Sequence, residues 1–199
     1  MSSKGKQVQK GVLVLFSSPS GGGKTTIVDR LLKRHPDWVR SVSMTTRAAR
    51  AGEKNGEDYF FVTKPEFEKM KADNGFLEYA NVFDCEYGTP RPFVEKQVES
   101  GKTVVLAIDV QGMKKIKQAV GGKISLLSIF ILPPSLKILR DRLEGRNTDT
   151  PEDIERRLDI AQEEIKQANC YDCTVVNQNL EDTVLEIDEI VNKFLKERR

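Results

Sequence analysis

The sequence is poor in the residue types that most often mark secreted or metal-binding proteins. Its 199 residues include three cysteines and one histidine. Cys85, Cys170 and Cys173 are too few and too irregularly spaced to form a disulfide framework. Cys170 and Cys173 have C-x-x-C spacing, but no second pair completes a zinc site, and His35 is far away in the sequence. We therefore expect structural or incidental thiols in a reducing compartment, the cytoplasm.

The chain also lacks a long apolar run and a strong net charge. Its apolar stretches are much shorter than the ~18 residues that a membrane span needs. Residues 1–10 form a polar, basic tail without the apolar core of a signal peptide. The formal net charge of +2 argues neither for nor against nucleic acid, so any anion site must come from local clustering. With 38% hydrophobic and 31% charged residues, the composition is typical of one globular domain.

A glycine-rich stretch follows an apolar run at residues 12–16 and precedes a helical pattern. Strand, tight loop and helix start are the context that a phosphate-binding P-loop requires. In such a loop the backbone N–H groups and the helix N-terminus attract anions, Lys24 can reach the β- and γ-phosphates, and the Thr25 hydroxyl can bind Mg²⁺. The residues predicted to contact ATP here are Ser18, Pro19, Ser20, Gly21, Gly22, Gly23, Lys24, Thr25 and Thr26. Ser18 replaces the first glycine of the pattern, and a glycine-rich turn before an ordinary helix is the alternative.

Strands and helices alternate along most of the chain, which predicts an α/β fold with a parallel sheet and helices on both faces. The predicted strands of this sheet are residues 12–16, 103–109, 124–132 and 173–177, while a short strand at residues 39–43 is assigned to the insertion described next. The predicted helices start at Thr26, Pro90, Gln111, Leu136, Pro151 and Leu180. The P-loop is expected at the carboxyl ends of the strands, where ligands bind in such sheets.

Residues 39–89 break this rhythm and predict an inserted small mixed sheet. Asn55 and Gly56 form a hairpin-turn signal, and strands are expected at residues 59–62 and 76–83. Thr63 and Glu66 have the spacing of a capping box at the start of a helix. The insertion is a plausible cover over an acceptor substrate, and the helices of residues 135–168 are a second candidate lid.

Two groups of arginines are candidates for binding phosphate, because guanidinium groups bind phosphate oxygens in a bidentate manner. Arg47 and Arg50 lie in a polar loop. The second group is Arg142, Arg146, Arg156 and Arg157. Arg142 and Arg146 are four residues apart and share a helix face. Arginines on amphipathic helices also commonly form a solvated face, and for Arg156 that alternative is equally acceptable.

Several segments, in the same order, resemble guanylate kinases. Residues 43–53, SMTTRAARAGE, resemble the loop that binds the GMP phosphate in that family. Further matching segments are 56–61 (GEDYFF), 76–78 (FLE), 87–89 (YGT), 108–112 (IDVQG), 130–135 (FILPPS), 142–146 (RLEGR) and 175–177 (VVN). The resemblance runs from about residue 11 to the C-terminus and is far more specific than the P-loop alone.

The resemblance implies a GMP site and assigns its residues. The GMP-binding positions are Ser43, Arg47, Arg50, Tyr59, Glu78, Tyr87, Thr89 and Asp109. Guanidinium and phenol groups suit the phosphate dianion. The Glu78 carboxylate can accept from N1–H and the 2-amino group of guanine, whereas adenine offers an acceptor at N1 and lacks that amine. A surface charge on a strand is the alternative for Glu78.

The resemblance further implies Mg²⁺-dependent phosphoryl transfer from ATP to GMP, within purine nucleotide metabolism. The implied catalytic residues are Lys24, Arg47, Arg142, Arg146 and Arg157, with Asn177 a candidate contact to adenine. Thr25 would bind Mg²⁺, mostly together with ATP phosphates and water. The implied partners are ATP and GMP, without nucleic acid or membrane, in a monomer or homodimer. Whether dGMP also serves as an acceptor is open.

The resemblance divides the chain into parts. Residues 11–199 form the kinase-like domain, with a core of residues 11–38, 90–134 and 169–199. The GMP-binding insertion is residues 39–89, and the lid is residues 135–168. The alternative function is a non-catalytic, guanylate kinase-like scaffold module that binds phosphopeptides, but such modules usually have a degraded P-loop.

Two positions depart from the family pattern. Ala107 stands where the family usually has an aspartate, so a carboxylate near Mg²⁺ or Lys24 is missing. Asp84, Cys85 and Glu86 replace a common Gly-Asn-Tyr before Tyr87, which leaves the shape of that loop open.

Overall fold

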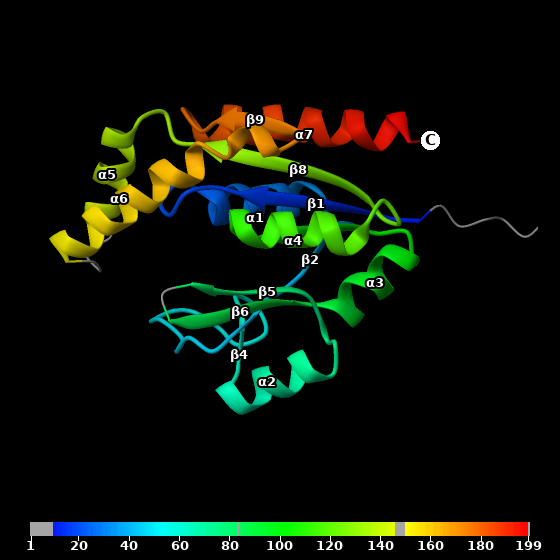
Figure 1. The fold of residues 1–199 in the computed structure, drawn as a ribbon. Helices are drawn as coiled ribbons and strands as arrows, with labels where there is room; N and C mark the ends of the chain where they lie inside the picture. The colour runs from blue at the N-terminus through cyan, green and yellow to red at the C-terminus, as the bar shows by residue number, and fades with distance from the viewer. Residues whose placement is uncertain (1–9, 83, 146–149, 199) are drawn as a thin grey trace, which may run out of the picture. The chain divides into compact units, whose positions relative to one another are not determined.

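The computed structural model describes residues 10–82, 84–145 and 150–198 (Figure 1). The chain forms two compact units. The first contains the described residues up to Leu13 together with Asp37–Val104 and Lys115–Leu126. The second contains Val14–Pro36, Val105–Lys114 and the chain from Leu127 onward. Each unit is therefore assembled from segments that are far apart in the sequence.

The larger sheet has five strands in the order β2-β7-β1-β8-β9. Its strands are β1 (Val12–Ser17), β2 (Val39–Arg40), β7 (Thr103–Ala107), β8 (Ser125–Leu132) and β9 (Cys173–Val176). β9 runs parallel to β8, with Cys173 opposite Ile129 and Val176 opposite Leu132. Every residue of β1 is buried, as the continuous apolar run predicts for a strand covered on both faces. The parallel sheet with flanking helices is confirmed.

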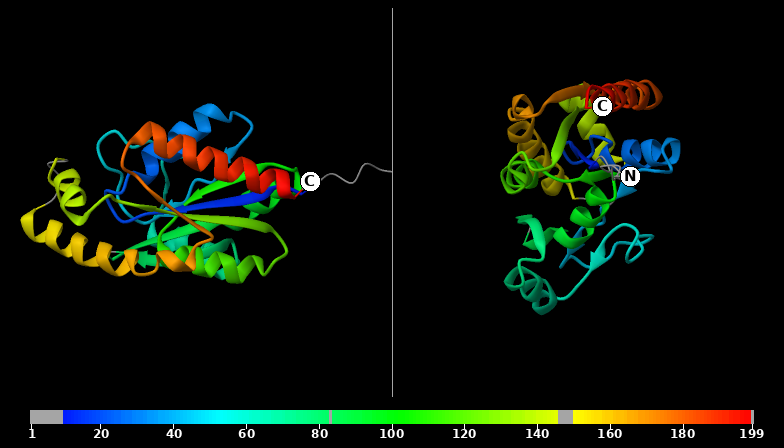
Figure 2. Two further views of the ribbon diagram at one scale, coloured as in Figure 1. Left: turned by 90° about the horizontal axis from the view of Figure 1, so that it is seen from above. Right: turned by 90° about the vertical axis from the view of Figure 1, so that its right-hand side faces the viewer.

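Helices of the second unit cover the part of this sheet that belongs to it. α1 (Lys24–Arg34) and α7 (Leu180–Glu197) contact each other on one face, and α6 (Pro151–Ile165) lies on the other (Figure 2). The remaining helices of the second unit are α5 (Leu136–Glu144) and the short η1 (Ala168–Cys170), and α4 (Val110–Val120) begins directly after the sheet's β7. None of the described helices is both long enough and apolar enough to cross a membrane.

A buried carboxylate fastens α1 to α7. Asp188 accepts hydrogen bonds from Nε and Nη2 of Arg34, both at 3.1 Å, and from Nδ2 of Asn192 at 2.9 Å. Nε2 of His35 lies 2.6 Å from the other carboxylate oxygen. The only histidine of the sequence is therefore part of a helix–helix contact rather than a metal site.

The first unit contains the smaller, mixed sheet predicted for residues 39–89, but the strand predicted at residues 39–43 is β2 of the larger sheet, so that part of the prediction is wrong. The strands of the smaller sheet are β3 (Met44–Thr45), β4 (Phe60–Phe61), β5 (Phe76–Val82) and β6 (Cys85–Pro90), in the order β4-β3-β6-β5. α2 (Lys64–Ala72) packs on it through Phe67, whose ring stacks on that of Phe76 at 4.6 Å. The predicted capping box is present at its start, where Thr63 and Glu66 bond reciprocally. α3 (Arg91–Glu99) follows β6 directly.

The prediction of a hairpin at Asn55 and Gly56 is wrong. The chain does turn there, since Gly56 has a φ of 82° and its N–H bonds to the Tyr59 carbonyl at 2.8 Å. The strands on either side, β3 and β4, run parallel, so the turn joins them through a longer crossing rather than a hairpin. The hairpin of this unit is formed instead by β5 and β6, and β3 and β6 were not predicted as strands.

Candidate active site

The P-loop prediction of strand, loop and helix is correct in its local geometry. β1 ends at Ser17 and α1 begins at Lys24. Gly21 and Gly23 have φ values of 88° and 95°, a left-handed conformation that other residues adopt at a cost. A Cβ atom on Gly23 would lie 2.4 Å from Nδ2 of Asn177. Both glycines are therefore required by the shape of the loop and by what packs against it.

The N-terminus of α1 is arranged to accept an anion. No side chain of the described chain caps it, and its first turn carries no acidic residue. The first N–H groups of a helix have no partner within the helix, and together with the helix dipole they attract negative charge. Nζ of Lys24 donates to the Ile108 carbonyl at 2.8 Å, which holds the ammonium beside the end of β7. The Thr25 and Thr26 side chains at the helix start are exposed.

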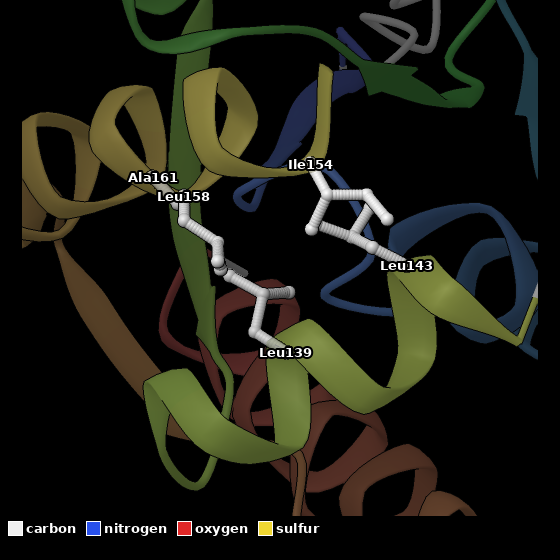
Figure 3. Close-up of a cluster of buried hydrophobic side chains, with 5 residues drawn as sticks. All are labelled: Leu139, Leu143, Ile154, Leu158 and Ala161. Carbon is white, nitrogen blue, oxygen red and sulfur yellow. The ribbon is translucent and has the colours of Figure 1, made fainter. Parts of the chain in front are cut away.

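α5 and α6 pack against this loop as one hydrophobic pair. Leu139 and Leu143 of α5 point toward Ile154, Leu158 and Ala161 of α6, and all five side chains are buried (Figure 3). The same two leucines of α5 approach the P-loop, since a Cβ atom on Gly21 would lie 3.0 Å from Leu139 and 3.2 Å from Leu143. The packing of α5 and α6 therefore places polar side chains of these two helices near the P-loop.

Two of the three predicted lid arginines contact the P-loop region. Nη1 of Arg157 donates to Oγ of Ser20 at 2.9 Å. Nη2 of Arg142 donates to the Asn177 carbonyl at 3.2 Å, while its Nη1 is buried and has no partner among the described residues. A buried guanidinium donor without an acceptor is costly, and an incoming phosphate oxygen would satisfy it. Arg146 lies outside the described residues.

Glu164, which was not assigned a role from the sequence, faces the same region. It lies seven residues after Arg157 on α6, hence on the same face of the helix. Burial raises the pKa of Glu164 to about 7, the positive charge of Lys24 opposes the rise, and the negative charge of Asp109 adds to it. A half-buried carboxylate therefore lies within electrostatic range of the P-loop lysine. The i, i+7 spacing from Arg157 was the signal that could have identified it.

Asp109 lies in the unit that carries the P-loop, directly after β7. Its Oδ1 accepts from the Gly112 N–H at 2.6 Å, at the start of α4, and its carbonyl accepts from Oγ of Ser17 at 3.4 Å. The other residues predicted to bind GMP lie in the first unit. Ala107, the last residue of β7, brings no carboxylate to this region. The negative charges of Asp109 and Glu164 interact with each other, and Glu164 also interacts with Lys24.

A cluster of cationic and phenol groups surrounds Arg47 in the first unit. The guanidinium lies 5.4 Å from the ring centroid of Tyr59 and 5.7 Å from that of Phe61. The Tyr59 and Tyr87 rings meet edge to face at 5.9 Å. Burial raises the pKa of Tyr59, so this phenol remains a hydrogen-bond donor. Three of the predicted phosphate-binding side chains are therefore brought together.

Glu53 holds this cluster in position, a role that was not assigned from the sequence. Both of its carboxylate oxygens accept from Nη2 of Arg47, at 2.8 and 2.9 Å, and Oε2 also accepts from the Arg50 N–H at 2.8 Å. The hydrogen bond from Arg47 lowers the pKa of Glu53. Burial alone would lower the pKa of Arg47, but hydrogen bonds to Glu53 and Tyr87 outweigh it and raise that pKa.

Two further predicted phosphate-binding residues lie in the same unit. The Arg50 side chain is exposed, and the Ser43 carbonyl accepts from the Phe60 N–H.

Glu78 is a buried carboxylate on β5, paired across the sheet with Thr89 of β6. Oγ1 of Thr89 donates to Oε1 of Glu78 at 2.7 Å. Thr89 is fully buried and Glu78 is 8% exposed, which contradicts the alternative of a surface charge. A carboxylate held in this way offers a fixed, desolvated acceptor to a ligand with two adjacent N–H donors.

The segment that departs from the family pattern contains the last residue before β6, Asp84, and the first two residues of that strand, Cys85 and Glu86. Asp84 has a φ of 62°, the left-handed conformation in which aspartate is tolerated and glycine is favoured. The common glycine is thus replaced without losing the turn. Thr46 supports the other end, since its Oγ1 accepts from the Glu86 N–H at 2.9 Å.

The described residues contain no cluster of three or more histidine, cysteine or acidic side chains that could hold a metal ion by itself. The exposed hydroxyl of Thr25, beside the anion-attracting start of α1, is an oxygen ligand of the type that Mg²⁺ prefers. Such a site fits a magnesium ion that is bound mainly through nucleotide phosphates. Cys85, Cys170 and Cys173 form no disulfide with one another.

The sequence and the structure match guanylate kinases along most of the chain. The family model for guanylate kinase matches residues 10–194. The guanylate kinase of Wolbachia sp. subsp. Brugia malayi is 49% identical over 184 residues, covering 92% of this chain and 93% of that protein. The guanylate kinase of Synechocystis sp. is 43% identical, with coverages of 92% and 95%. The crystal structure of guanylate kinase from Anaplasma phagocytophilum matches with a TM-score of 0.77 and 37% identity, covering 93% of this chain and 86% of that one.

Proposed function

The chain belongs to the guanylate kinase family, and we propose that its two sites hold ATP and GMP for phosphoryl transfer. The protein is a transferase that phosphorylates GMP, as its relatives do. The terminal phosphoryl group of ATP passes to the phosphate of GMP, which gives ADP and GDP. Binding of dGMP in place of GMP remains compatible with the acceptor residues, because none of the proposed contacts involves the ribose.

The acceptor site is formed by residues of the mixed sheet and its loop. The Arg47 and Arg50 guanidinium groups and the Tyr59 and Tyr87 phenols bind the GMP phosphate, with Ser43 nearby. Glu78 accepts from N1–H and the 2-amino group of guanine. Thr89 helps to hold the base, and the resemblance to guanylate kinases adds Asp109, which does not belong to the mixed sheet. Adenine presents an acceptor at N1 and lacks the 2-amino group, so it offers the desolvated Glu78 carboxylate no matching donors and is a poor acceptor.

The donor site is the P-loop together with the helices packed on it. The N–H groups of residues 18–26 surround the ATP phosphates, Lys24 binds the β- and γ-phosphates, and Thr25 is the protein's ligand to Mg²⁺. Magnesium, when bound, neutralises charge on the transferring phosphoryl group. Asn177 also belongs to this site.

The remaining task of the protein is to align the reactants and stabilise charge. The transferred group spreads negative charge over its oxygens, and Arg142, Arg146 and Arg157 approach it when residues 135–168 close as a lid. Closure also excludes water and so limits ATP hydrolysis. Residues 11–38, 90–134 and 169–199 form the core of this arrangement and residues 39–89 form the acceptor insertion, whereas the tail predicted at residues 1–10 lies, except for Lys10, outside the described residues.

One observation carries the proposal most directly: Glu78 is buried and bonded to Thr89 on the same small sheet that holds the Arg47 cluster. A base-reading carboxylate and a phosphate-binding arginine thus belong to one compact unit, as a purine monophosphate requires. The P-loop, with Gly23, Lys24 and Thr25 in place, argues against the scaffold alternative. The free cysteines fit a reducing compartment, which we propose to be the cytoplasm, where the protein acts as a monomer or homodimer.

The proposal is tested by measuring ADP release from ATP with GMP, AMP or CMP as the acceptor, with and without Mg²⁺. We expect turnover with GMP that depends on Mg²⁺ and is abolished in Lys24→Ala. Lys33→Ala, which removes a lysine from the last turn of α1, is the matched control. Absence of GMP-dependent ADP release from the wild-type chain would refute the proposed reaction.

A further inference from the structure

Asn177 is buried at the point where β9 leaves the sheet. It is 5% exposed, and its N–H donates to the carbonyl of Leu132, the last residue of β8, at 2.8 Å. Its carbonyl accepts from Arg142 of α5. The backbone of Asn177 is therefore fixed both by the sheet and by a predicted lid arginine.

The side chain of Asn177 packs on the P-loop. Its Nδ2 donates to the Gly22 carbonyl at 2.8 Å, and both residues are buried. Oδ1 lies 3.5 Å from Oγ1 of Thr183, near the start of α7, whose proton is directed mainly to the Asn179 carbonyl at 2.6 Å. The amide donor of Asn177 is thus committed to the P-loop, and the side chain is buried, which leaves it poorly suited to reading a nucleobase.

We propose that Asn177 is a positioning residue that sets the orientation of the Gly22–Gly23 peptide for the donor phosphates, rather than a contact to adenine. A trans peptide is planar, so its C=O and N–H groups point in opposite directions. While Asn177 holds the Gly22 carbonyl, the Gly23 N–H is directed away from Asn177 and serves the anion. If the peptide rotated, a carbonyl oxygen would face the phosphates and repel them.

The position of Gly23 supports this role. The left-handed conformation of Gly23 brings its Cα close to the amide, and a Cβ there would collide with Nδ2 at 2.4 Å. The contact is therefore specific to this backbone conformation. Because Arg142 bonds to the carbonyl of the same residue, the loop and the lid arginine share one anchor. The inference rests on the proposed function in that the bound anion is the triphosphate of the donor.

The test compares Asn177→Asp, which keeps the shape but replaces the donor N–H with an oxygen, with Asn177→Ala and wild type. Asn179→Ala is the matched control, since Asn179 caps α7 with its side chain and does not bond to the P-loop. Three quantities are measured: affinity for inorganic tripolyphosphate by calorimetry, kcat and KM with ATP or inosine triphosphate as the donor, and Tm. Affinity for GMP is measured in parallel.

We expect Asn177→Asp to weaken tripolyphosphate binding about tenfold, because it breaks a buried hydrogen bond and leaves the Gly22 carbonyl without its donor. KM should rise by the same factor for ATP and inosine triphosphate, so their ratio stays that of wild type. Asn179→Ala should lower Tm and leave tripolyphosphate binding unchanged.

Three results would overturn the inference. One is an altered preference between ATP and inosine triphosphate with unchanged tripolyphosphate affinity, which would make Asn177 a base contact. Another is unchanged binding and kinetics in both Asn177 variants. The third is a parallel loss of tripolyphosphate and GMP affinity together with Tm, which would indicate a merely structural residue. Tripolyphosphate binding does not depend on turnover, so failure of the proposed reaction would be seen separately.

Discussion

At the scale of single residues, one buried carboxylate is expected to decide which base is accepted. Glu78 is held by Thr89 and is largely removed from water. In Glu78→Gln an amide NH₂ or a single neutral oxygen would face N1–H and the 2-amino group of guanine. Mismatched buried donors and acceptors cost more than the lost hydrogen bond itself.

We predict that Glu78→Gln lowers kcat/KM for GMP on the order of 100-fold, as expected when a site built around specific hydrogen bonds loses one partner. The measurement is ADP release with GMP and with IMP, which has N1–H but lacks the 2-amino group. The preference for GMP over IMP should shrink. Glu95→Gln on α3 is the control, and an unaltered GMP-to-IMP ratio in Glu78→Gln would contradict the assigned role.

Glu164 gives a prediction about pH and stability. Its pKa is raised from 4.5 in the unfolded chain to about 7 in the folded protein. Between these values the folded state binds more protons than the unfolded state, so the contribution of Glu164 to stability falls as pH rises. Below the unfolded pKa both states are protonated and the contribution vanishes.

Glu164→Gln should therefore stabilise the protein by at most about 3 kcal/mol at pH values above the folded pKa, because solvent screens this half-buried group, and by almost nothing in acid. Thermal unfolding of the variant and of wild type across the pH range measures this difference. Glu163→Gln is the matched control, because Glu163 is an exposed neighbour paired with Lys166. A stability difference that did not change with pH would contradict the raised pKa.

Residues whose role depends on a local pattern were predictable, and those whose role depends on tertiary contacts were not. Gly23, Lys24 and Thr25 follow from the spacing of strand, loop and helix. The position of Glu78 on a strand was predicted, but its burial depends on the pairing of β5 with β6. Asn177 was predicted to contact adenine, whereas its amide bonds to the P-loop across 155 residues of sequence. A pattern of neighbouring residues cannot predict a contact between positions so far apart in the sequence.

At the scale of elements, the helical pair α5–α6 is the candidate moving part. It is held together by apolar contacts, while its links to the P-loop include the leucines near Gly21 and the hydrogen bond from Arg157 to Ser20. Ser135 and Thr150 cap the two helices, since each side chain accepts from a backbone N–H of the first turn. A pair with its own small core can change position as one body.

Arg157→Ala should lower kcat on the order of 100-fold, because a donor aimed at developing charge is lost, with little change in Tm. The adjacent Arg156→Ala is the control, since Arg156 lies on a neighbouring face of α6. Pre-steady-state and steady-state measurements of ADP formation separate the transfer step from product release. Equal losses of kcat in the two variants would show that Arg157 has no special part in transfer.

The strong helices were predictable because their caps and apolar spacing are local, as in the capping box of Thr63 and Glu66. The short strands of the mixed sheet were not. β3 is two residues long and pairs in parallel with β4, where Met44 lies opposite Phe60, and in antiparallel with β6, where Met44 lies opposite Gly88. Such pairing depends on segments that are not neighbours in the sequence. The turn signal at Asn55 and Gly56 therefore predicted a turn correctly but predicted the wrong pairing for the strands on either side of it.

At the scale of the whole molecule, each compact unit is discontinuous in sequence. β1 begins in one unit and ends in the other, and the same is true of β7. The division of the sequence into core, insertion and lid is based on motifs and uses contiguous segments. It cannot reveal the boundary between the two units, because that boundary depends on which segments pack together. In the structure, the Arg47 cluster and Glu78 belong to one compact unit and the P-loop belongs to the other.

This placement predicts that the two substrates bind through separable sets of residues. Arg47→Ala should weaken GMP binding on the order of 10- to 100-fold, since a charge-assisted pair to phosphate is lost, and leave ATP binding near wild type. Lys24→Ala should weaken ATP binding and retain GMP affinity, although both variants lose turnover. Calorimetric titration of each variant with each nucleotide measures the four affinities. If either substitution weakened both nucleotides equally while the protein kept its wild-type Tm, the acceptor and donor sites could not be the independent sets of residues assigned above.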